Sequence, residues 1–525
     1  MLERIRGSSV DPGVFYVSVG VAAAFVVWGV LGTESLSAAA SAALGYVISN
    51  FGWLFVLSTF GFLVFVLFLA FSRYGSIRLG RDGEEPEFRT SSWVAMMFSV
   101  GMGIGLMFYG VAEPISHLTA PPHGLAEPGS EDAARLAMQY SYFHWALHPW
   151  AIYAVVGLSL AYFVFRKGKS NLISTAFYPL LGERVEGAPG KAIDVLAIFA
   201  TLFGTATSLG LGALQINGGL NYLWGIPVGT GVAIGIIAVL TVAFVVSAVT
   251  GVHNGIQWLS NTNMVLAALL LLFVLVVGPT VFIFNTFTES IGDYFSRLVP
   301  MSFQTAAFGD AEWLAGWTIF YWAWWISWTP FVGTFIARIS RGRTIREFVL
   351  GVLVVPSVVT FVWFAVLGGT ALDMQLDGQG DIAAAVAESP AAALFATLEE
   401  LPLSVPMSLL AIFLVALFFV SGADAGAVVM GMLSSRGVLE PNRALVALWG
   451  ILAGAAAAIC LLSGGLEGLQ QAAIISAAPF VVVMILMCYS LFRELRSETL
   501  PGIAPPEYDG ARRQEAPRQR ARREP

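Results

Sequence analysis

Long apolar runs constrain this chain more than any other feature. Stretches of eighteen or more mostly apolar residues recur along most of its length, and each is long enough to cross a bilayer as an α-helix. Hydrophobic residues make up 57% of the chain and charged residues 12%, which is about half the charged share of an average soluble protein. The sequence therefore predicts an all-α membrane protein and excludes a soluble globular fold.

We predict twelve transmembrane helices from these runs, with both termini in the cytoplasm. The helices span approximately 14–34, 51–72, 93–112, 138–165, 191–219, 227–249, 256–285, 312–338, 344–370, 402–434 (broken), 442–463 and 472–492. With this count, only Arg135 and Arg297 of the 27 Lys and Arg residues fall outside the cell. This distribution follows the excess of basic residues in cytoplasmic loops, and we expect a plasma-membrane location.

The cysteines and the two ends of the chain add little to the prediction of fold and function. Cys460 and Cys488 lie inside predicted spans, where they read as small apolar residues. The first apolar run exceeds signal-peptide length and is predicted to be a retained helix. The Arg-rich tail, residues 493–525, is predicted to be disordered, either resting on anionic lipid or free in solvent.

Residues 313–335 read WLAGWTIFYWAWWISWTPFVGTF, with six tryptophans in the first sixteen positions. Aromatic residues recur here at three- and four-residue steps, which places them in one stripe along a helix. The stripe consists of Trp317, Tyr321, Trp324, Trp325, Trp328 and Phe331. It fits a packing face or a lipid-facing belt. It also fits a binding site for quaternary ammonium groups, which electron-rich ring faces attract.

A second aromatic group lies in the fourth predicted helix, around the sequence FHWALHPWAIY. Trp145, Trp150 and Tyr153 flank Pro149, which is expected to kink the helix. His144 and His148 are spaced i, i+4 like a metal-binding pair, but the sequence places no third ligand nearby. We therefore predict no metal site here.

Two places inside predicted spans have the composition of a broken helix. The first is Gly101-Met102-Gly103-Ile104-Gly105, where each glycine weakens a helix by about 1 kcal/mol relative to alanine and lets a ligand approach the main chain. Close packing of helices through small residues is the alternative. The second is residues 418–426, where Asp424 is a functional candidate or, as we favour, the cap of a half-helix.

Hydroxyl side chains gather in the fifth predicted helix. Thr201, Thr205 and Ser208 share one helical face, where they can bind Na⁺ or a neighbouring helix. Elsewhere the sequence shows no nucleophile–base pair and no metal cluster, and Glu113 and Asp424 are isolated. We therefore expect neither an enzyme nor a cofactor, apart from a coupling ion, and no nucleic-acid partner.

The segments GMGIGLMFYGVAEP (101–114), FHWALHPWAIY (143–153) and FYWAWWISWTPFVGTFIARISRGRTIREFVLGVLVVP (320–356) resemble the betaine/choline/carnitine transporter (BCCT) family. The similarity covers about residues 14–495 and is strongest to sodium-coupled glycine-betaine symporters. It implies a leucine-transporter-like fold with two inverted repeats of five helices, helices 3–7 and 8–12, and a homotrimer. The implied segments are an N-terminus (1–13), two peripheral helices (14–92), repeats at 93–285 and 312–492 around an outer interfacial segment (286–311), and the tail (493–525).

The resemblance also implies the site residues. Those for the substrate are Trp145, Trp150, Tyr153, Trp324, Trp325, Trp328, Gly101, Met102, Gly103, Gly105 and Ser208. One Na⁺ site would use Ser99, Met102, Phe418 and Ser421, and a second would use Thr201, Thr205, Tyr153 and Phe331. Choline-transporting members have a similar glycine motif but carry Asp where this chain has Gly105. The motif of this chain therefore favours a zwitterionic substrate over a cationic one.

One departure from the symporter pattern concerns the first Na⁺ site. The symporters have two adjacent hydroxyl residues where this chain reads Ser421-Gly422, so Gly422 removes one expected ligand. We still expect Na⁺-coupled import of glycine betaine or a similar zwitterion by alternating access. Alternatives are a Na⁺-independent exchanger of quaternary amines, or a transporter of choline, ectoine or dimethylsulfoniopropionate. A rival of another class is a channel or a membrane sensor that binds betaine without moving it.

Overall fold

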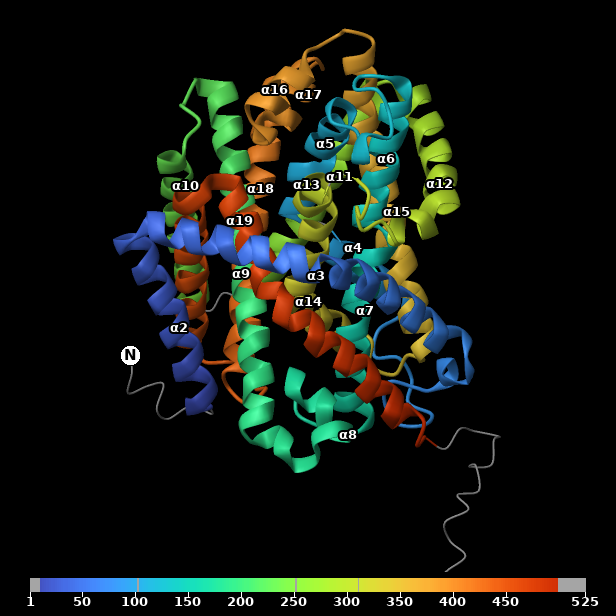
Figure 1. The fold of residues 1–525 in the computed structure, drawn as a ribbon, viewed down its shortest axis with the longest axis vertical. Coiled ribbons are helices and arrows are strands. Elements are labelled where there is room, and N and C mark those ends of the chain that lie inside the picture. The colour runs from blue at the N-terminus through green and yellow to red at the C-terminus, as the bar shows by residue number, and fades with distance from the viewer. Residues whose placement is uncertain (1–9, 102, 251–252, 310, 499–525) are drawn as a thin grey trace, which may run out of the picture.

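The computed structural model describes residues 10–101, 103–250, 253–309 and 311–498, and over these residues it is helical throughout (Figure 1). Within the described part of the chain, β-pairing is limited to one isolated bridge between Arg78 and Thr344. The prediction of an all-α fold is therefore confirmed. The two predicted ends, 1–9 and 499–525, lie outside the described residues.

The helices of eight or more residues follow the predicted apolar runs. They are α2 (Pro12–Leu31), α3 (Thr33–Phe71), α4 (Thr90–Gly101), α5 (Ile104–Thr119), α6 (Glu131–Trp145), α7 (Leu147–Ala161), α9 (Ala188–Trp224), α10 (Thr230–Thr250), α11 (His253–Val277), α12 (Thr280–Ser302), α14 (Phe320–Ile339), α15 (Ile345–Leu376), α18 (Ser404–Leu433) and α19 (Arg443–Leu495). Shorter helices are α8 (Tyr178–Leu181), α13 (Ala311–Leu314), α16 (Ile382–Glu388) and α17 (Ala393–Glu399). Single turns of π-helix occupy Tyr162–Arg166 and Ala315–Ile319.

Polar side chains fix several helix starts. The Asp11 carboxylate accepts hydrogen bonds from the backbone N–H groups at the start of α2, and Ser130 caps α6 in the same way. Thr344 and Glu347 form a reciprocal capping box on α15. Such caps satisfy N–H groups that have no partner within the helix, so these starts are encoded locally.

Eight of the described helices are long and apolar enough to cross a membrane, or nine if the bent pair Asn261–Val277 and Thr280–Ser302 is one span. One of the eight is α19, whose 53 residues would extend about 80 Å as a single helix, far beyond the ~30 Å bilayer core. Gly464 and Gly465 leave helical geometry inside it and divide it into two segments. Twelve spans remain a prediction, since they require counting both halves of α19 and the pieces around α4/α5 and α13/α14.

Two of the predicted helices differ in form from those in the structure. One is bent where we predicted a continuous helix, and the other is continuous where we predicted a break. The run predicted as one helix over 256–285 ends at Val277 and turns by 109° into α12, because Pro279 cannot donate to the helical ladder. The segment 402–434, predicted to be broken, contains the continuous helix α18. A break inside the bilayer leaves backbone groups unpaired at several kcal/mol each, which outweighs the ~1 kcal/mol that each glycine of this stretch costs a helix.

A central group of helices, α5, α7, α9, α14 and α18, packs together around the middle of the molecule. Helices α3 and α19 pack on each other and run obliquely across this group, as the blue and red ribbons of Figure 1 show. The peripheral helices α2 and α10 are only 28% and 17% buried over their most apolar windows. Their exposed valines and aromatic rings form the kind of surface that faces lipid.

Ion pairs gather on loops predicted to be cytoplasmic. Arg166, at the end of α7, binds both carboxylate oxygens of Glu498 and also contacts Asp82. Lys167 binds Glu494 and Glu498. Burial alone would raise the pKa of the Glu498 carboxyl, but hydrogen bonds from Arg166, Tyr162 and Lys167 outweigh burial and lower it to about 2. The end of α19 is therefore fastened to the end of α7.

Candidate functional site

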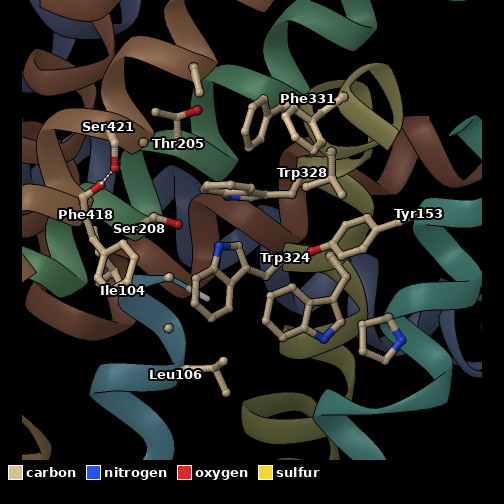
Figure 2. Close-up of a pocket in the computed structure, with 18 of the residues that line it drawn as sticks. Ile104, Leu106, Tyr153, Thr205, Ser208, Trp324, Trp328, Phe331, Phe418 and Ser421 are labelled. Carbon is tan, nitrogen blue, oxygen red and sulfur yellow. Dashed lines mark hydrogen bonds between the residues drawn. The ribbon is translucent and has the colours of Figure 1, made fainter. Parts of the chain in front are cut away.

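The described residues form a cavity of about 360 Å³ among the central helices (Figure 2). This volume falls within the range of small-molecule sites, about 300–1,000 Å³. Its walls come from α5, α7, α9, α11, α14, α15 and α18 together with Gly103 and the last residue of α6. Segments far apart in the sequence therefore meet at one site, and they include both aromatic groups and the glycine motif identified above.

The tryptophan stripe of α14 is a cavity wall and not a lipid belt. Trp324, Trp325, Trp328 and Phe331 line the cavity, and the rings of Trp324 and Trp325 stack at 4.7 Å and 16°. Trp324 is 2% exposed and Trp325 is 7% exposed. Trp317 and Tyr321 lie nearer the start of the aromatic stripe, before Trp324 in the chain. The Tyr321 ring stacks on the Trp325 ring at 5.8 Å. The structure thus excludes a lipid-facing role for these rings.

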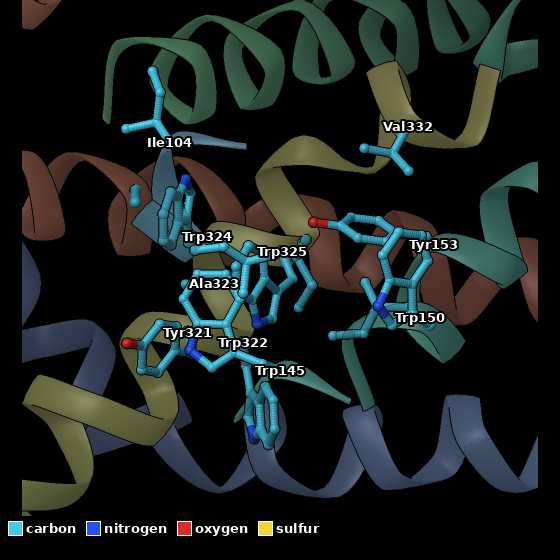
Figure 3. Close-up of a cluster of buried hydrophobic side chains, with 14 of the residues drawn as sticks. Ile104, Trp145, Trp150, Tyr153, Tyr321, Trp322, Ala323, Trp324, Trp325 and Val332 are labelled. Carbon is cyan, nitrogen blue, oxygen red and sulfur yellow. The ribbon is translucent and has the colours of Figure 1, made fainter. Parts of the chain in front are cut away.

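The second aromatic group packs directly against the first beside the cavity. Trp145 meets Trp325 edge-on at 4.7 Å, and Tyr153 meets Trp325 at 6.3 Å. Trp150 lies edge-on to Tyr153 at 5.3 Å. Figure 3 shows these rings converging from α6, α7 and α14. We call the four residues Trp145, Trp150, Tyr153 and Trp325 the aromatic wall.

A helix break between α6 and α7 positions Trp145 and Trp150. The chain leaves helical geometry at Ala146, three residues before Pro149, so the predicted kink is confirmed. Pro149 has no N–H to donate to the Trp145 carbonyl, and the Thr360 hydroxyl donates to that oxygen instead, at 3.1 Å. The Trp325 indole N–H donates to the His144 carbonyl at 2.9 Å. Side chains of neighbouring helices therefore satisfy the backbone that the break releases.

The glycine motif forms the second break. Helix α4 ends at Gly101, Gly103 is extended, and α5 begins at Ile104, so the predicted interruption is confirmed; Met102 lies outside the described residues. A Cβ atom at Gly105 would lie 2.7 Å from ring atoms of both Trp145 and Trp324. Gly105 is therefore required by the close approach of two indoles to the main chain, and it lines the cavity with Gly103.

Five of the eight residues expected to bind Na⁺ line the cavity, and three of these lie on its α9 and α18 side. These three are Thr205, Phe418 and Ser421, and Ser208, expected to bind the substrate, lies beside them (Figure 2). Tyr153 and Phe331 also line it. Thr201 is not among the described lining residues and donates to the Ala197 carbonyl at 2.8 Å. The structure does not describe the side chains of Ser99 and Met102.

Gly422 and Asp424 lie on the unbroken helix α18 and line the same cavity. Because this helix has no break, the interpretation of Asp424 as the cap of a half-helix is wrong. A Cβ atom at Gly422 would meet nothing within 4 Å, so the position of the missing hydroxyl is open space.

Sequence reasoning missed three contributors to the site. Asn263, on α11, is buried, and its amide nitrogen lies 3.4 Å from the Ser421 hydroxyl; its oxygen has no partner among the described residues. The second is Thr360, described above. The third is Glu113, which the sequence presented as isolated but which lies beside His117 and His144. The i, i+4 spacing of Glu113 and His117 was the one available signal.

His144 and His148, which we predicted not to form a metal site, do not act as a pair, because they contact different residues. His144 contacts Glu113, whereas His148 lies beyond the break at Ala146 and shares a hydrogen bond with Ser302 at 2.9 Å. The group of potential ligands that does form is Glu113, His117 and His144, whose ligand atoms lie within 4.8 Å of one another.

Comparisons with known proteins agree with this architecture. Residues 13–500 match the family model described as BCCT, betaine/carnitine/choline family transporter. Over 488 residues the chain is 51% identical to the glycine betaine transporter OpuD of Bacillus subtilis (strain 168), covering 92% of this chain and 94% of that one. It is 46% identical to a probable glycine betaine transporter of Desulfitobacterium hafniense (92% and 97% covered) and 43% identical to an ectoine/hydroxyectoine transporter of Virgibacillus pantothenticus (93% and 97%). The chain therefore belongs to the betaine/carnitine/choline transporter family and is a multi-pass membrane transporter, not an enzyme.

Proposed function

We propose that this transporter imports glycine betaine or a similar zwitterionic solute together with Na⁺, by alternating access. The observation that carries the proposal is the central cavity, which has an aromatic wall at one end and polar groups at the other. A zwitterion with a quaternary ammonium group and a carboxylate needs these two environments in one site. Two of the relatives compared above are named for glycine betaine and one for ectoine and hydroxyectoine.

The aromatic wall suits the quaternary ammonium group. Rings from three helices surround one region of the cavity, and each is 5–7% exposed, so water competes weakly for the cation there. A cation over such a ring gains about 0.5–2 kcal/mol, and several rings act together. A sulfonium or a cyclic amidinium satisfies the same requirement, so dimethylsulfoniopropionate and ectoine are the nearest alternative substrates.

Three features suit the substrate carboxylate. The indole N–H groups of Trp324 and Trp328 are buried with no partner in the part of the chain that the structure describes, and both residues line the cavity. The Ser208 hydroxyl lines it as well. Helix α5 begins at the cavity with Ile104, and the N-terminal end of a half-helix favours negative charge. The substrate carboxylate thus finds two indole donors without a partner among the described residues, and a Ser208 hydroxyl that bonds only to the carbonyl of Gly204 in its own helix.

Choline fits less well, because the glycine motif has no carboxylate at position 105 and the surrounding rings leave little room for one. An aspartate there would collide with Trp145 and Trp324 unless these rings moved. Asp424 is the one described acidic residue in the cavity lining, and it lies on α18. The site therefore favours a substrate that carries its own negative charge.

The proposed Na⁺ sites lie at the α9–α18 side. Thr205, with Thr201, Tyr153 and Phe331, would form one site, and Ser421, with Phe418, Ser99 and Met102, the other. We propose that the unpartnered oxygen of Asn263 replaces the ligand lost at Gly422, because the Asn263 amide group already contacts Ser421. Hard oxygen ligands of this kind suit a monovalent cation.

The test is uptake of radiolabelled glycine betaine into proteoliposomes under an inward Na⁺ gradient, compared with an equal K⁺ gradient. We expect uptake only with Na⁺. Equal uptake in both would replace symport with exchange or proton coupling, and counterflow without Na⁺ would then identify an exchanger. No uptake in either would redirect the substrate assignment to choline, ectoine and sulfonium compounds, which the same vesicles can test.

The assembly and orientation are part of the proposal. We propose a homotrimer in the plasma membrane, in contact with lipid and with both termini cytoplasmic. The predicted cytoplasmic loops support this orientation, because the described Lys and Arg ion pairs each join residues assigned to that side. Cysteine labelling from each side of right-side-out vesicles, and the mass of the purified complex, test the two statements.

A further inference from the structure

Glu113 is a fully buried carboxylate that the transport proposal does not use. It lies in α5 at 0% exposure, behind the aromatic wall and outside the group of described residues that line the cavity. A buried charge in a membrane helix is expensive, and it persists only where hydrogen bonds compensate it. The partners of Glu113 therefore indicate its role.

Both carboxylate oxygens are fully engaged. One oxygen, Oε2, accepts hydrogen bonds from the Trp145 indole N–H at 2.7 Å and the Tyr321 hydroxyl at 2.5 Å. The other, Oε1, lies 2.7 Å from His144 Nδ1 and 3.3 Å from His117 Nε2. The partners come from α5, α6 and α14, so one carboxylate joins α5 to the two helices that carry Trp145 and Trp325 of the aromatic wall.

Two of these partners determine ring positions in the aromatic wall. Trp145 belongs to the wall and lies edge-on to Trp325 at 4.7 Å. Tyr321 lies behind the wall, where it stacks on Trp325 at 5.8 Å and meets Trp145 at 5.4 Å (Figure 3). Cation–π attraction depends on the cation lying over ring faces, so a small rotation of either ring changes it.

We propose that Glu113 is a positioning residue for the quaternary ammonium site, acting through Trp145 and Tyr321. Its negative charge strengthens both hydrogen bonds, which are charge-assisted, and it holds the two rings at fixed angles to Trp325. His144 and His117 face the other oxygen and fix the orientation of the carboxylate. His144 is itself held by Thr318, 2.9 Å from its Nε2 atom.

Metal binding is the alternative role for the same residues, since Glu113, His117 and His144 offer three ligand atoms. The contacts favour hydrogen bonding, because Oε2 is committed to two donors and His144 bonds on both ring nitrogens. Elemental analysis of the purified transporter separates the two cases. One equivalent of bound zinc would overturn the hydrogen-bonding role.

The decisive experiment combines Glu113→Gln with Tyr321→Phe. Glu113→Gln keeps the size of the side chain but removes its charge, and Tyr321→Phe keeps the ring but removes its hydroxyl. We expect each to raise the KM for glycine betaine about fivefold, the difference between a charge-assisted and an ordinary hydrogen bond, with kcat little changed. The double variant should show much less than the product of the two effects, because both disturb the same contact.

Tyr142→Phe is the matched control. Tyr142 is also buried, and its hydroxyl donates to the Phe361 carbonyl at 3.0 Å, away from the described cavity lining. Its loss should lower thermal stability and leave the KM unchanged. An equal rise in KM for Tyr142→Phe and Tyr321→Phe would overturn the proposal, as would multiplicative effects in the double variant.

The inference rests on the proposed substrate, and the design separates the two. Failure of the unmodified transporter to take up glycine betaine would refute the proposed function. Normal uptake with an unchanged KM in Glu113→Gln would refute only the role of Glu113. If Glu113→Gln does not reach the membrane, Tyr321→Phe alone decides, because an unchanged KM in that variant removes the contact from substrate binding.

Discussion

The two sides of the cavity are built differently. On the aromatic wall, hydrogen bonds between helices fix two of the four rings: Trp325 donates to His144, and Trp145 donates to Glu113. On the opposite side the Ser208 and Ser421 hydroxyl groups donate to carbonyls of their own helices, at Gly204 and Phe418, although Ser421 also accepts from Asn263 at 3.4 Å. We call Thr205, Ser208, Ser421 and Asn263 the hydroxyl wall.

This difference indicates how each wall would respond to a ligand. The rings are held by packing and by buried hydrogen bonds, and each aromatic pair contributes about 0.5–1.5 kcal/mol beyond its buried area. A hydroxyl group that bonds to its own helix can turn toward an ion at small cost, because it exchanges one weak bond for an ion contact. We therefore expect a preorganised substrate end and an adaptable ion end.

The largest expected effect comes from crowding the aromatic wall. Gly105→Ala should raise the KM for glycine betaine tenfold or more, because its methyl group would lie 2.7 Å from Trp145 and Trp324 and overpacking costs about 1–3 kcal/mol. Gly422→Ala is the matched control on the hydroxyl wall, where the added methyl group meets nothing within 4 Å. Equal effects of the two variants on uptake kinetics would remove the contrast between the walls.

Removing one ring should have the next largest effect. Trp325→Leu is expected to raise the KM about two- to thirtyfold, since a ring face over a cation contributes about 0.5–2 kcal/mol. Trp325→Phe keeps a ring and should recover part of the loss. Concentration-dependent uptake of radiolabelled glycine betaine measures both, and an unchanged KM in Trp325→Leu would take this residue out of the site.

Removing one hydroxyl group from the hydroxyl wall should change the Na⁺ dependence of uptake more than its dependence on glycine betaine concentration. Thr205→Ala is expected to raise the Na⁺ concentration for half-maximal uptake about fivefold, the effect of losing one polar contact of about 1 kcal/mol. Thr205→Ser retains the hydroxyl and should behave like the unmodified protein. If the Na⁺ activation curve of Thr205→Ala does not move, this residue is not an ion ligand.

The smallest effect should come from restoring the missing hydroxyl. Gly422→Ser fills open space beside Ser421 and should lower the Na⁺ requirement about twofold, because in our proposal Asn263 already supplies a replacement ligand. Asn263→Ala should raise the requirement, and Gly422→Ser should restore it in the double variant. A failure of that rescue would show that the two side chains do not serve one ion.

Local sequence patterns predicted much of this molecule. Apolar runs gave the positions of most helices, because a membrane span needs continuous apolar length. The repeated glycines near Gly103 and the proline at position 149 predicted real helix breaks, since both residues weaken the backbone ladder wherever they occur. The spacing of the α14 tryptophans placed them on one face, although spacing alone could not separate a belt from a binding wall.

The patterns failed where packing decided the outcome. Residues 418–426 have small and polar residues like a break, yet α18 continues through them. Asn263 carried no local signal, and its role depends on α11 lying beside α18. Glu113 looked isolated because its partners Trp145 and Tyr321 are 32 and 208 residues away in the chain.

The sequence by itself determined that this chain is a helical membrane protein and which family it resembles, because hydrophobic length and motif spacing are properties of the chain alone. Only the tertiary structure decided which rings face one another, why Gly105 must be small, and how a buried carboxylate is satisfied. These depend on distances between helices, and helices that meet in space can be hundreds of residues apart in the sequence.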